Sequence, residues 1–222
     1  LKGFGTQMGF GNLQNFLEKG RSAVFFSATL LPIRYYKQLL STEEEAYAIY
    51  ARSPFDPANR LLLLGKDVST RYTRRGEGMY QRYARYLLAA ASGKQGNYIA
   101  FFPSYRFMEA VYEEFQKLLE EEKEKPGIEC VMQSQYMTEE AREIFLENFE
   151  EAREQSLMGF CVMGGIFAEG IDLARDRLIG AVIVGTGLPQ VCRERELLKE
   201  YFDGKGKKGF DYAYLYPGMN KV

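Results

Sequence analysis

The sequence predicts an α/β protein built on a doubly wound, mostly parallel sheet with helices on both faces. Short apolar runs recur along the chain, and segments whose apolar residues repeat at helical spacing lie between them. The runs are apolar at consecutive positions rather than at alternate ones, which is typical of strands buried on both faces. The alternation of strand and helix predicts right-handed βαβ units.

The predicted strands and helices can be placed from these patterns. Strands are expected at Ala23–Phe26, Tyr98–Phe102, Ile128–Met132, Phe160–Met163 and Ile179–Val184. Helical stripes run from Met79 to Ala90, from Met108 to Leu119 and from Ala141 to Ala152. Thr138 is placed to cap the last of these helices.

The residues that follow the predicted strands are the first candidates for function. Ligands of an open parallel sheet bind beyond the carboxyl ends of its strands. We therefore expect the stretches after Phe102, Met163 and Val184 to lie along one edge of the sheet.

Composition and charge limit the classes of protein that this chain can belong to. The 222 residues are 46% hydrophobic and 27% charged, which is typical of a globular protein with a sizeable core. The formal net charge of −1 means that any contact with nucleic acid must be local. No apolar run approaches the roughly 18 residues that span a bilayer, and no signal peptide is recognisable, so neither a membrane partner nor secretion is predicted.

The absence of histidine and the few cysteines exclude much catalytic chemistry. With no His in the chain, neither a Ser-His-Asp triad nor a zinc site with imidazole ligands can form. The three cysteines, Cys130, Cys161 and Cys192, form no CxxC pair, so no metal site is expected. We interpret them as reduced thiols of an intracellular protein, either cytoplasmic or nuclear.

A proline-containing segment suggests a domain junction. The sequence SPFDPAN at 53–59 places two prolines after the first strand and helix, so we divide the chain into residues 1–52 and 53–222. The chain begins with Leu and ends in YPGMNKV, and we interpret it as a fragment of a longer protein. For the basic run GKGKKG at 204–209, a surface turn is favoured about two to one over a phosphate contact.

Several short motifs occur in a specific order. They are SATL at 27–30, SPFDPANR at 53–60, FFPSYRFME at 101–109, QSQ at 133–135, IFAEGIDL at 166–173 and GAVIVGTGLP at 180–189. In this order they resemble motifs III, IV and V of superfamily 2 DNA helicases, specifically the branch that contains XPD and DinG. The resemblance implies that residues 53–222 form most of a second RecA-like domain, and that residues 1–52 are the tail of the first or a connecting segment.

The glycine-rich stretch after the fourth predicted strand has two readings. The residues alone favour a structural role over a ligand site by about two to one. In that role the glycines Gly164, Gly165 and Gly170 allow a tight turn, and Glu169 and Asp172 cap the following helix. The resemblance implies instead that Glu169, Gly170 and Asp172 face the nucleotide between two RecA-like domains. It also implies that Gly164 and Gly165 lie near the DNA backbone.

The other strand-end stretches also carry alternatives. Ser27, Ala28 and Thr29 form an ordinary small-residue turn, whereas the resemblance implies that they couple the ATP state to domain position.

Ser104, Tyr105 and Arg106 offer a hydroxyl, a ring and a cation, which suits a single-stranded DNA backbone. A simple helix cap by Ser104 is equally favoured. With the resemblance, Gln133 joins the candidates for DNA contact.

The sequence lacks parts that a complete helicase needs. It contains neither a G-x-x-x-x-G-K-[ST] phosphate loop nor an acidic Mg²⁺ box, and the family's QxxGRxxR motif would follow directly after Val222. We therefore expect the fragment to be inactive alone and to bind no cofactor. The longer protein would use ATP and Mg²⁺, and its partners would be single-stranded DNA and its own first RecA-like domain. The iron-sulfur cysteines of this family lie in that first domain, so the sequence does not indicate whether the longer protein holds a cluster.

Two other functions fit the same fold. One is an RNA helicase or a double-strand translocase, because nothing in these residues reads a 2′-hydroxyl. The other is a non-catalytic interaction module that kept the RecA-like sheet. A phosphate loop and an acidic box in the upstream sequence would favour the enzyme.

Overall fold

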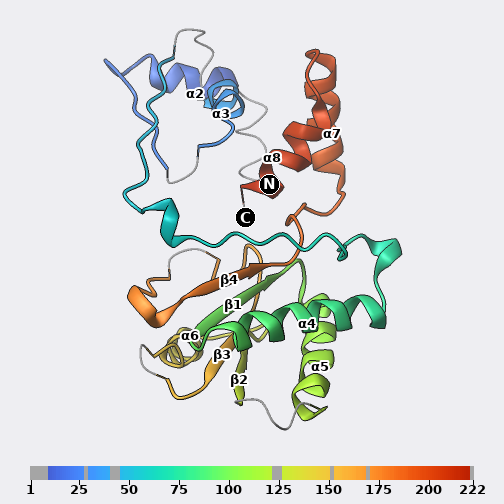
Figure 1. The fold of residues 1–222 in the computed structure, drawn as a ribbon. Coiled ribbons are helices and arrows are strands. Elements are labelled where there is room, and N and C mark those ends of the chain that lie inside the picture. The colour runs from blue at the N-terminus through green and yellow to red at the C-terminus, as the bar shows by residue number, and fades with distance from the viewer. Residues whose placement is uncertain are drawn as a thin grey trace. The chain divides into compact units, whose positions relative to one another are not determined.

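The computed structural model describes residues 10–27, 30–40, 46–121, 127–150, 153–168 and 171–220 (Figure 1). The chain divides into two compact units. The sheet unit is Gly65–Gly187, and the helical unit contains the described residues up to Leu64 together with Leu188–Asn220. No helix among the described residues is long and apolar enough to cross a membrane.

The sheet unit contains four parallel strands, as the sequence predicts. They are β1 Asn97–Phe102, β2 Ile128–Met132, β3 Ser156–Val162 and β4 Gly180–Ile183, in the spatial order β2-β3-β1-β4. All three strand pairs are parallel. β2 has the predicted bounds, whereas β3 begins at Ser156 rather than at Phe160 because Ser156 already pairs with Ile128. The prediction of an α/β fold with a parallel sheet is confirmed.

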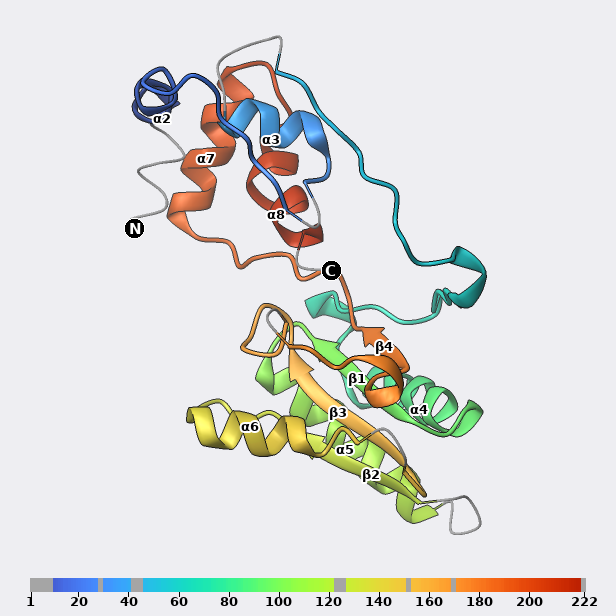
Figure 2. The ribbon, with the colours of Figure 1, turned by 90° about the vertical axis from the view of Figure 1, so that its left-hand side faces the viewer.

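Helices cover both faces of this sheet (Figure 2). The helices of the sheet unit are α4 Glu77–Gly93, α5 Tyr105–Glu121 and α6 Glu139–Glu147, with short 3₁₀ turns at Tyr72–Arg74 and Arg175–Arg177. α4 and α5 pack on one face and α6 on the other. The cap of α6 is the predicted one, since the hydroxyl of Thr138 accepts a hydrogen bond from the Ala141 amide at 3.2 Å.

Strand β1 shows why consecutive positions are apolar. Ala100 and Phe102 lie in the core with α4 and α5, while Ile99 lies in the core with α6, and all three are fully buried. Side chains of a strand point alternately to its two faces, so a strand covered on both sides needs apolar residues throughout.

An aromatic stack forms the centre of the core on the α4–α5 side. The ring of Phe160 stacks on Phe102 with centroids 5.6 Å apart and an interplanar angle of 4°. The rings of Tyr112 and Phe115 meet Phe160 edge-on at 5.1 and 5.6 Å. This arrangement explains why α5 repeats aromatic residues at helical spacing.

Two details of the predicted elements were wrong. Residues Ala23–Phe26 form no strand, and Val24 and Phe26 are 82% and 90% exposed. An apolar run becomes a strand only when a neighbour supplies hydrogen bonds, and no strand among the described residues pairs with this run. Helix α6 ends at Glu147 instead of continuing, although Phe149 beyond it remains fully buried in the core.

The helical unit is held together by tyrosines. It contains α2 Phe10–Leu17, α3 Ile33–Leu40, the 3₁₀ turn Pro57–Asn59, α7 Arg193–Gly204, a π-helix at Asp211–Leu215 and α8 Tyr216–Met219. Tyr35 of α3 packs against Phe202, Tyr212 and neighbouring residues, and burial raises its pKa to about 12. The Asn220 amide donates to the Tyr36 hydroxyl at 2.7 Å, so the unit joins segments from both sides of the predicted junction at 52/53.

The basic run GKGKKG forms the turn that ends α7. The backbone amide of Lys205 bonds to the carbonyl oxygens of Tyr201 and Phe202, and Gly206 has a φ of 69°. The Gly209 amide donates to the Asp203 carboxylate at 2.8 Å. The glycines therefore close a helix end, and the lysines between them are exposed.

We predict that Phe160→Ala lowers the free energy of unfolding by about 3–5 kcal/mol, because it leaves a cavity among three aromatic rings. Urea denaturation followed by circular dichroism measures this loss. Ile144→Ala is the matched control, because Ile144 is 62% exposed and its truncation should cost no more than about 0.5 kcal/mol. Equal losses for the two variants would contradict the assignment of Phe160 to the centre of the core.

Candidate ligand edge of the parallel sheet

The carboxyl ends of the four strands meet at one edge of the sheet unit. Backbone hydrogen bonds continue the ladder past the strand ends, from the Gln133 amide to Phe160, from Met163 to Phe102 and from Val184 to Phe101, at 2.8–2.9 Å. The stretches after Phe102, Met163 and Val184 therefore lie along one edge, as predicted. This is the edge at which open parallel sheets bind ligands.

The buried side chain of Gln133 connects three elements at this edge. It is 2% exposed and lies directly after β2. Its Oε1 accepts a hydrogen bond from the Val162 amide at 2.9 Å, and its Nε2 donates to the Tyr105 hydroxyl at 2.8 Å. The amide thus joins the ends of β2 and β3 to the first residue of α5.

Tyr105 is partly buried by this arrangement. Burial, followed by the nearby Cys161 thiol, raises the pKa of its hydroxyl, so the group stays a hydrogen-bond partner rather than a charge. Both ends of the Gln133 amide are occupied within the domain, which leaves it little surface for a ligand. What Gln133 does in the structure is to position its neighbours.

The two glycines after β3 form a tight turn against Gln133. Gly164 has a φ of 70°, a conformation that favours glycine, and it is exposed. At Gly165, a Cβ would lie 3.0 Å from the Val162 carbonyl oxygen and 3.1 Å from Nε2 of Gln133. The turn therefore favours glycine at both positions, and it leaves the backbone of Gly164 accessible beside the ligand edge.

Ser104 lies directly before helix α5. Its hydroxyl accepts a hydrogen bond from the Phe107 amide at 3.3 Å, which is the geometry of a helix cap. Arg106 is exposed, and Ser104 and Tyr105 are partly buried. Of the three predicted contact residues after β1, Arg106 therefore presents the most open side chain.

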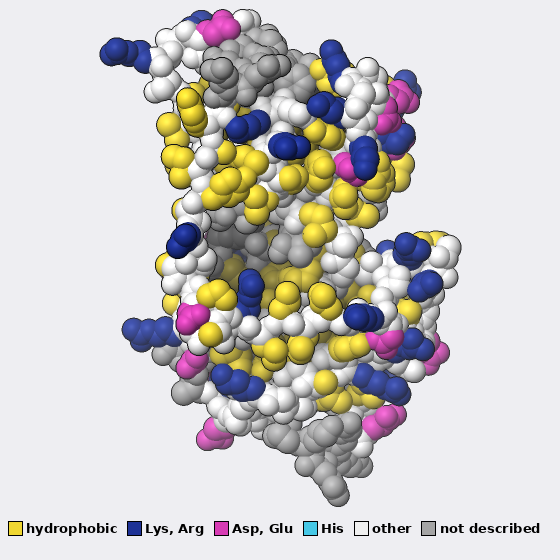
Figure 3. All heavy atoms as spheres, turned by 45° about the horizontal axis from the view of Figure 1, so that its top comes forward, with side chains coloured by type: hydrophobic (Ala, Val, Ile, Leu, Met, Phe, Trp, Pro, Cys, Tyr) yellow, Lys and Arg dark blue, Asp and Glu magenta, His cyan; other side chains and the backbone are white. Residues whose placement is uncertain are grey.

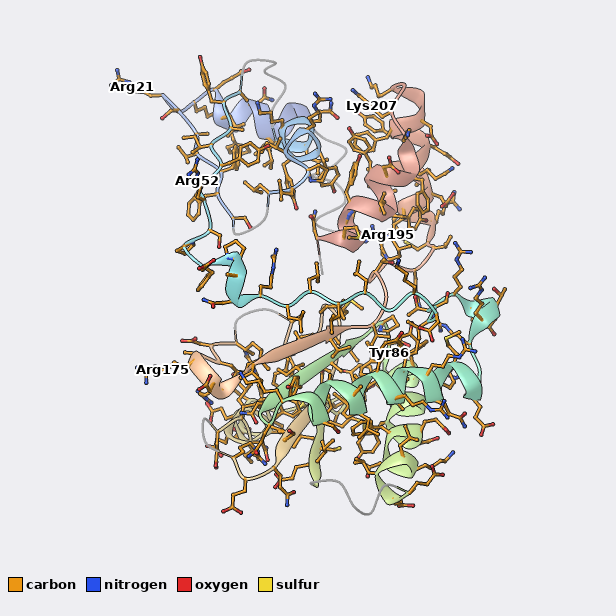
Figure 4. The ribbon with its side chains drawn as sticks, viewed as in Figure 1. Arg21, Arg52, Tyr86, Arg175, Arg195 and Lys207 are labelled. Atoms are coloured by element: carbon orange, nitrogen blue, oxygen red, sulfur yellow. The ribbon has the colours of Figure 1, made fainter. Side chains whose placement is uncertain are left out.

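The segment that follows Gly165 is anchored in the core. The ring of Phe167 is fully buried and stacks on Phe145 of α6 with centroids 4.3 Å apart. Asp172 lies beyond it with an exposed side chain, while Glu169 and Gly170 lie outside the described residues. Arg175 follows with a φ of 55°, and its side chain points away from the sheet (Figure 4).

The first predicted motif falls in the helical unit. Ser27 is exposed, and Ala28 and Thr29 lie outside the described residues. Its coupling role stays a prediction.

A basic turn at the ligand edge was missed by the sequence analysis. Residues 71–75 read RYTRR and form the turn before α4. The side chain of Thr70 lies so close to Gly185, after β4, that a Cβ there would meet it at 2.7 Å. The guanidinium of Arg75 lies 5.3 Å from the ring centroid of Phe107 in the first turn of α5. Basic residues interleaved with an aromatic ring are the signal that identifies such a segment from sequence.

The surface depression that involves Glu129, Asn148 and Gln155 lies elsewhere. It sits at the amino ends of β2 and β3, where the Arg153 guanidinium pairs with Glu129. It carries none of the predicted motifs, so we do not place the ligand site there. Nowhere in the described ranges do three or more Cys, Asp or Glu side chains converge as metal ligands would.

Together, the sheet order, the helices on both faces and the ligand edge define an α/β domain of the RecA-like type. The family model for the helicase C-terminal domain matches residues 87–222, and the chain belongs to this family. The match covers β1 and everything that follows it, including the strand-end stretches with Ser104, Gln133 and Asp172.

Individual proteins that are similar to this chain are also helicases by name. The chain is 26% identical over 186 residues to a protein of Methanocaldococcus jannaschii named "Probable ATP-dependent helicase", covering 81% of this chain and 27% of that protein. Two solved structures described as apo XPD and XPD helicase share the fold with TM-scores of 0.52, at 23% and 24% identity. They match 70% and 71% of this chain but only 30% and 26% of their own lengths, so the chain spans less than a third of each of these relatives.

We predict that Gln133→Ala lowers the free energy of unfolding by about 1–3 kcal/mol, because the Val162 amide and the Tyr105 hydroxyl lose their partner. The Val162 amide should also exchange its hydrogen faster. Gln135→Ala is the control, since Gln135 is exposed two residues away and should cost at most about 0.5 kcal/mol. Unchanged exchange at Val162 in Gln133→Ala would show that the amide does not hold the strand ends.

Proposed function

We propose that this chain is part of an XPD/DinG-like ATP-dependent DNA helicase, which couples ATP hydrolysis to movement along single-stranded DNA and to duplex unwinding. The observation that carries the proposal is the placement of the motif IV and motif V stretches at one edge of a parallel sheet, in a chain of the helicase C-terminal domain family. The likeness to a protein named as an ATP-dependent helicase supports the use of ATP.

The proposed site assigns different ligands to different strand ends. Glu169, Gly170 and Asp172 would face ATP and its Mg²⁺ across a cleft completed by the first RecA-like domain of the longer protein, and Ser27, Ala28 and Thr29 would couple the two domains. Arg106 and the backbone of Gly164 would contact single-stranded DNA, with Ser104, Tyr105 and Gly165 shaping that surface. The buried side chain of Gln133 would hold this surface in place through its hydrogen bonds to Val162 and Tyr105. Residues 53–222 would form most of the second RecA-like domain.

Catalysis in this proposal is positioning and charge stabilisation at the transferred phosphoryl group. The phosphate loop, the acidic box and the arginine finger are not in this sequence, so this chain would neither bind nor hydrolyse ATP by itself. We also propose an intracellular location for the longer protein, which the free thiols of Cys130, Cys161 and Cys192 support.

The isolated chain should bind no ATP that isothermal titration can detect, because the groups that supply most of the binding energy in this class are absent. A longer version of the protein with both domains is the positive control. Micromolar binding of ATP to this chain alone would contradict the proposed division of the site.

In the full-length protein, Asp172→Ala should lower DNA-stimulated ATP hydrolysis strongly. The loss of a charged partner in a closed site costs about 2 to 4 kcal/mol, roughly one and a half to three decades in rate. Affinity for single-stranded DNA should change little. If Asp172 only caps a turn, the variant loses about 1 kcal/mol of stability and keeps its turnover per folded molecule.

Arg106→Ala should show the opposite pattern in the same assays. It removes about one phosphate contact, so it should weaken binding to single-stranded DNA and reduce the salt slope by about 0.7, with hydrolysis at saturating DNA less affected. Melting temperature, ATPase rate and DNA affinity are measured on both variants. A stable, fully active Asp172→Ala protein would remove the nucleotide-facing assignment.

A further inference from the structure

The turn before α4 concentrates positive charge on a chain whose net charge is close to zero. Between residue 66 and the start of α4 there are four basic residues and one acidic residue, a net of +3, whereas the whole chain carries −1. We call Arg71–Arg75 the basic turn. Its five residues are all exposed, and Tyr72 is 84% exposed. Figure 3 shows several Lys and Arg side chains, with Asp and Glu among them, on the right-hand side of this face, where the turn before α4 lies in Figure 1.

The basic turn is fixed in place by its own contacts. The Arg75 guanidinium lies over the rings of Tyr72 and Phe107, at 5.8 and 5.3 Å, and its Nε donates to the Thr70 carbonyl at 3.0 Å. The backbone amide of Ser69 contacts the Met79 sulfur at 3.4 Å. Arg75 therefore anchors the turn, and the turn is bound to the start of α5 on one side and to α4 on the other.

These contacts place the basic turn at the ligand edge. Thr70, just before the turn, lies against Gly185 in the stretch that follows β4. Arg75 contacts Phe107, which lies in the first turn of α5, in the stretch that follows β1. Strands β1 and β4 are neighbours in the sheet, so the turn borders the strand-end surface that carries Arg106.

The side chains of Arg71 and Arg74 have no protein partner in the part of the chain that the structure describes. Neither forms an ion pair there with a carboxylate, and neither side chain makes a hydrogen bond there. Asp67, the nearest acidic residue before the turn, accepts a hydrogen bond from the hydroxyl of Tyr86, and this bond lowers the pKa of the Asp67 carboxyl. Tyr86 lies on α4 (Figure 4). The two guanidinium groups are therefore available to an external anion.

Two open guanidinium groups in the same turn as an exposed aromatic ring match a particular ligand. Guanidinium groups pair with phosphates, and an exposed ring stacks with an unpaired base. A duplex keeps its bases stacked on one another, so the ring would have no partner there, and an acidic peptide would use the arginines but not the ring.

From this arrangement we infer that Arg71, Tyr72 and Arg74 form a further contact for single-stranded DNA, continuous with the strand-end surface and outside the motifs described above. The inference rests on the proposed function, since it extends the DNA path of the same domain. Arg71 and Arg74 hold successive phosphates, Tyr72 stacks on a base between them, and Arg75 keeps the turn in position.

The test measures binding of the full-length protein to a fluorescent dT20 oligonucleotide by anisotropy at several salt concentrations. Removing two phosphate contacts in R71A/R74A should reduce the slope of log K against log salt by about 1.4 and weaken binding about ten-fold or more at 0.1 M salt. Tyr72→Ala should weaken binding about ten-fold and leave the salt slope unchanged. Tyr72→Phe should bind dT20 as tightly as the unmodified protein does, because only the ring is needed.

Arg85→Ala is the matched control, since it removes an exposed arginine from α4 outside the turn and should leave both affinity and slope unchanged. All four positions are exposed, so melting temperatures should stay within a few degrees of the original protein. Binding to poly-glutamate is measured in parallel on the same variants.

The outcomes separate this inference from the proposed function. Suppose that the unmodified protein binds dT20, and that R71A/R74A and Tyr72→Ala bind it with the same affinity and the same salt slope. The basic turn is then not a DNA contact, and the proposed function stands. If R71A/R74A loses poly-glutamate binding but not dT20 binding, the turn serves an acidic protein and the inference is overturned. If the unmodified protein does not bind dT20 at all, the proposed function fails together with it.

Discussion

The ligand edge of this domain depends on one buried amide. Gln133 joins the ends of β2 and β3 to the first residue of α5, so the loops that carry the motifs do not have independent conformations. A buried amide with both ends paired specifies one arrangement, because any other would leave a polar group without a partner in the interior. The tight fit of Gly165 against this amide makes the following turn part of the same constraint.

The parallel sheet makes such a constraint effective. Because all strands run in one direction, their carboxyl ends and the helix starts that follow them meet along one line. Phe167 then anchors the motif V segment from the α6 side, and Arg75 fixes the basic turn from the α5 side. Side chains that we propose as ligand contacts, such as Arg106 and Asp172, can remain exposed, because residues with buried partners hold the backbone between them.

Most of the sheet unit could be predicted from sequence because local pattern and tertiary burial agree there. Consecutive apolar positions mark β1, and the hydroxyl of Thr138 marks the start of α6. The same pattern failed at Ala23–Phe26, since whether a run becomes a strand depends on a neighbour that its own residues do not encode. The role of Gln133 could not be predicted either, because its partners Val162 and Tyr105 are 29 and 28 residues away in the sequence.

The basic turn shows why total charge is a weak guide to the partners of such a domain. Of the 30 acidic residues only Asp67 and Glu77 lie close to the turn in sequence, while the arginines of the turn stand at the edge where ligands of parallel sheets bind. Screening limits electrostatic attraction to about 8–10 Å at moderate salt, so a phosphate at this edge responds to the nearby guanidinium groups rather than to the distant carboxylates. A net charge of −1 is therefore compatible with a nucleic-acid surface when the fold gathers its cations beside the strand ends.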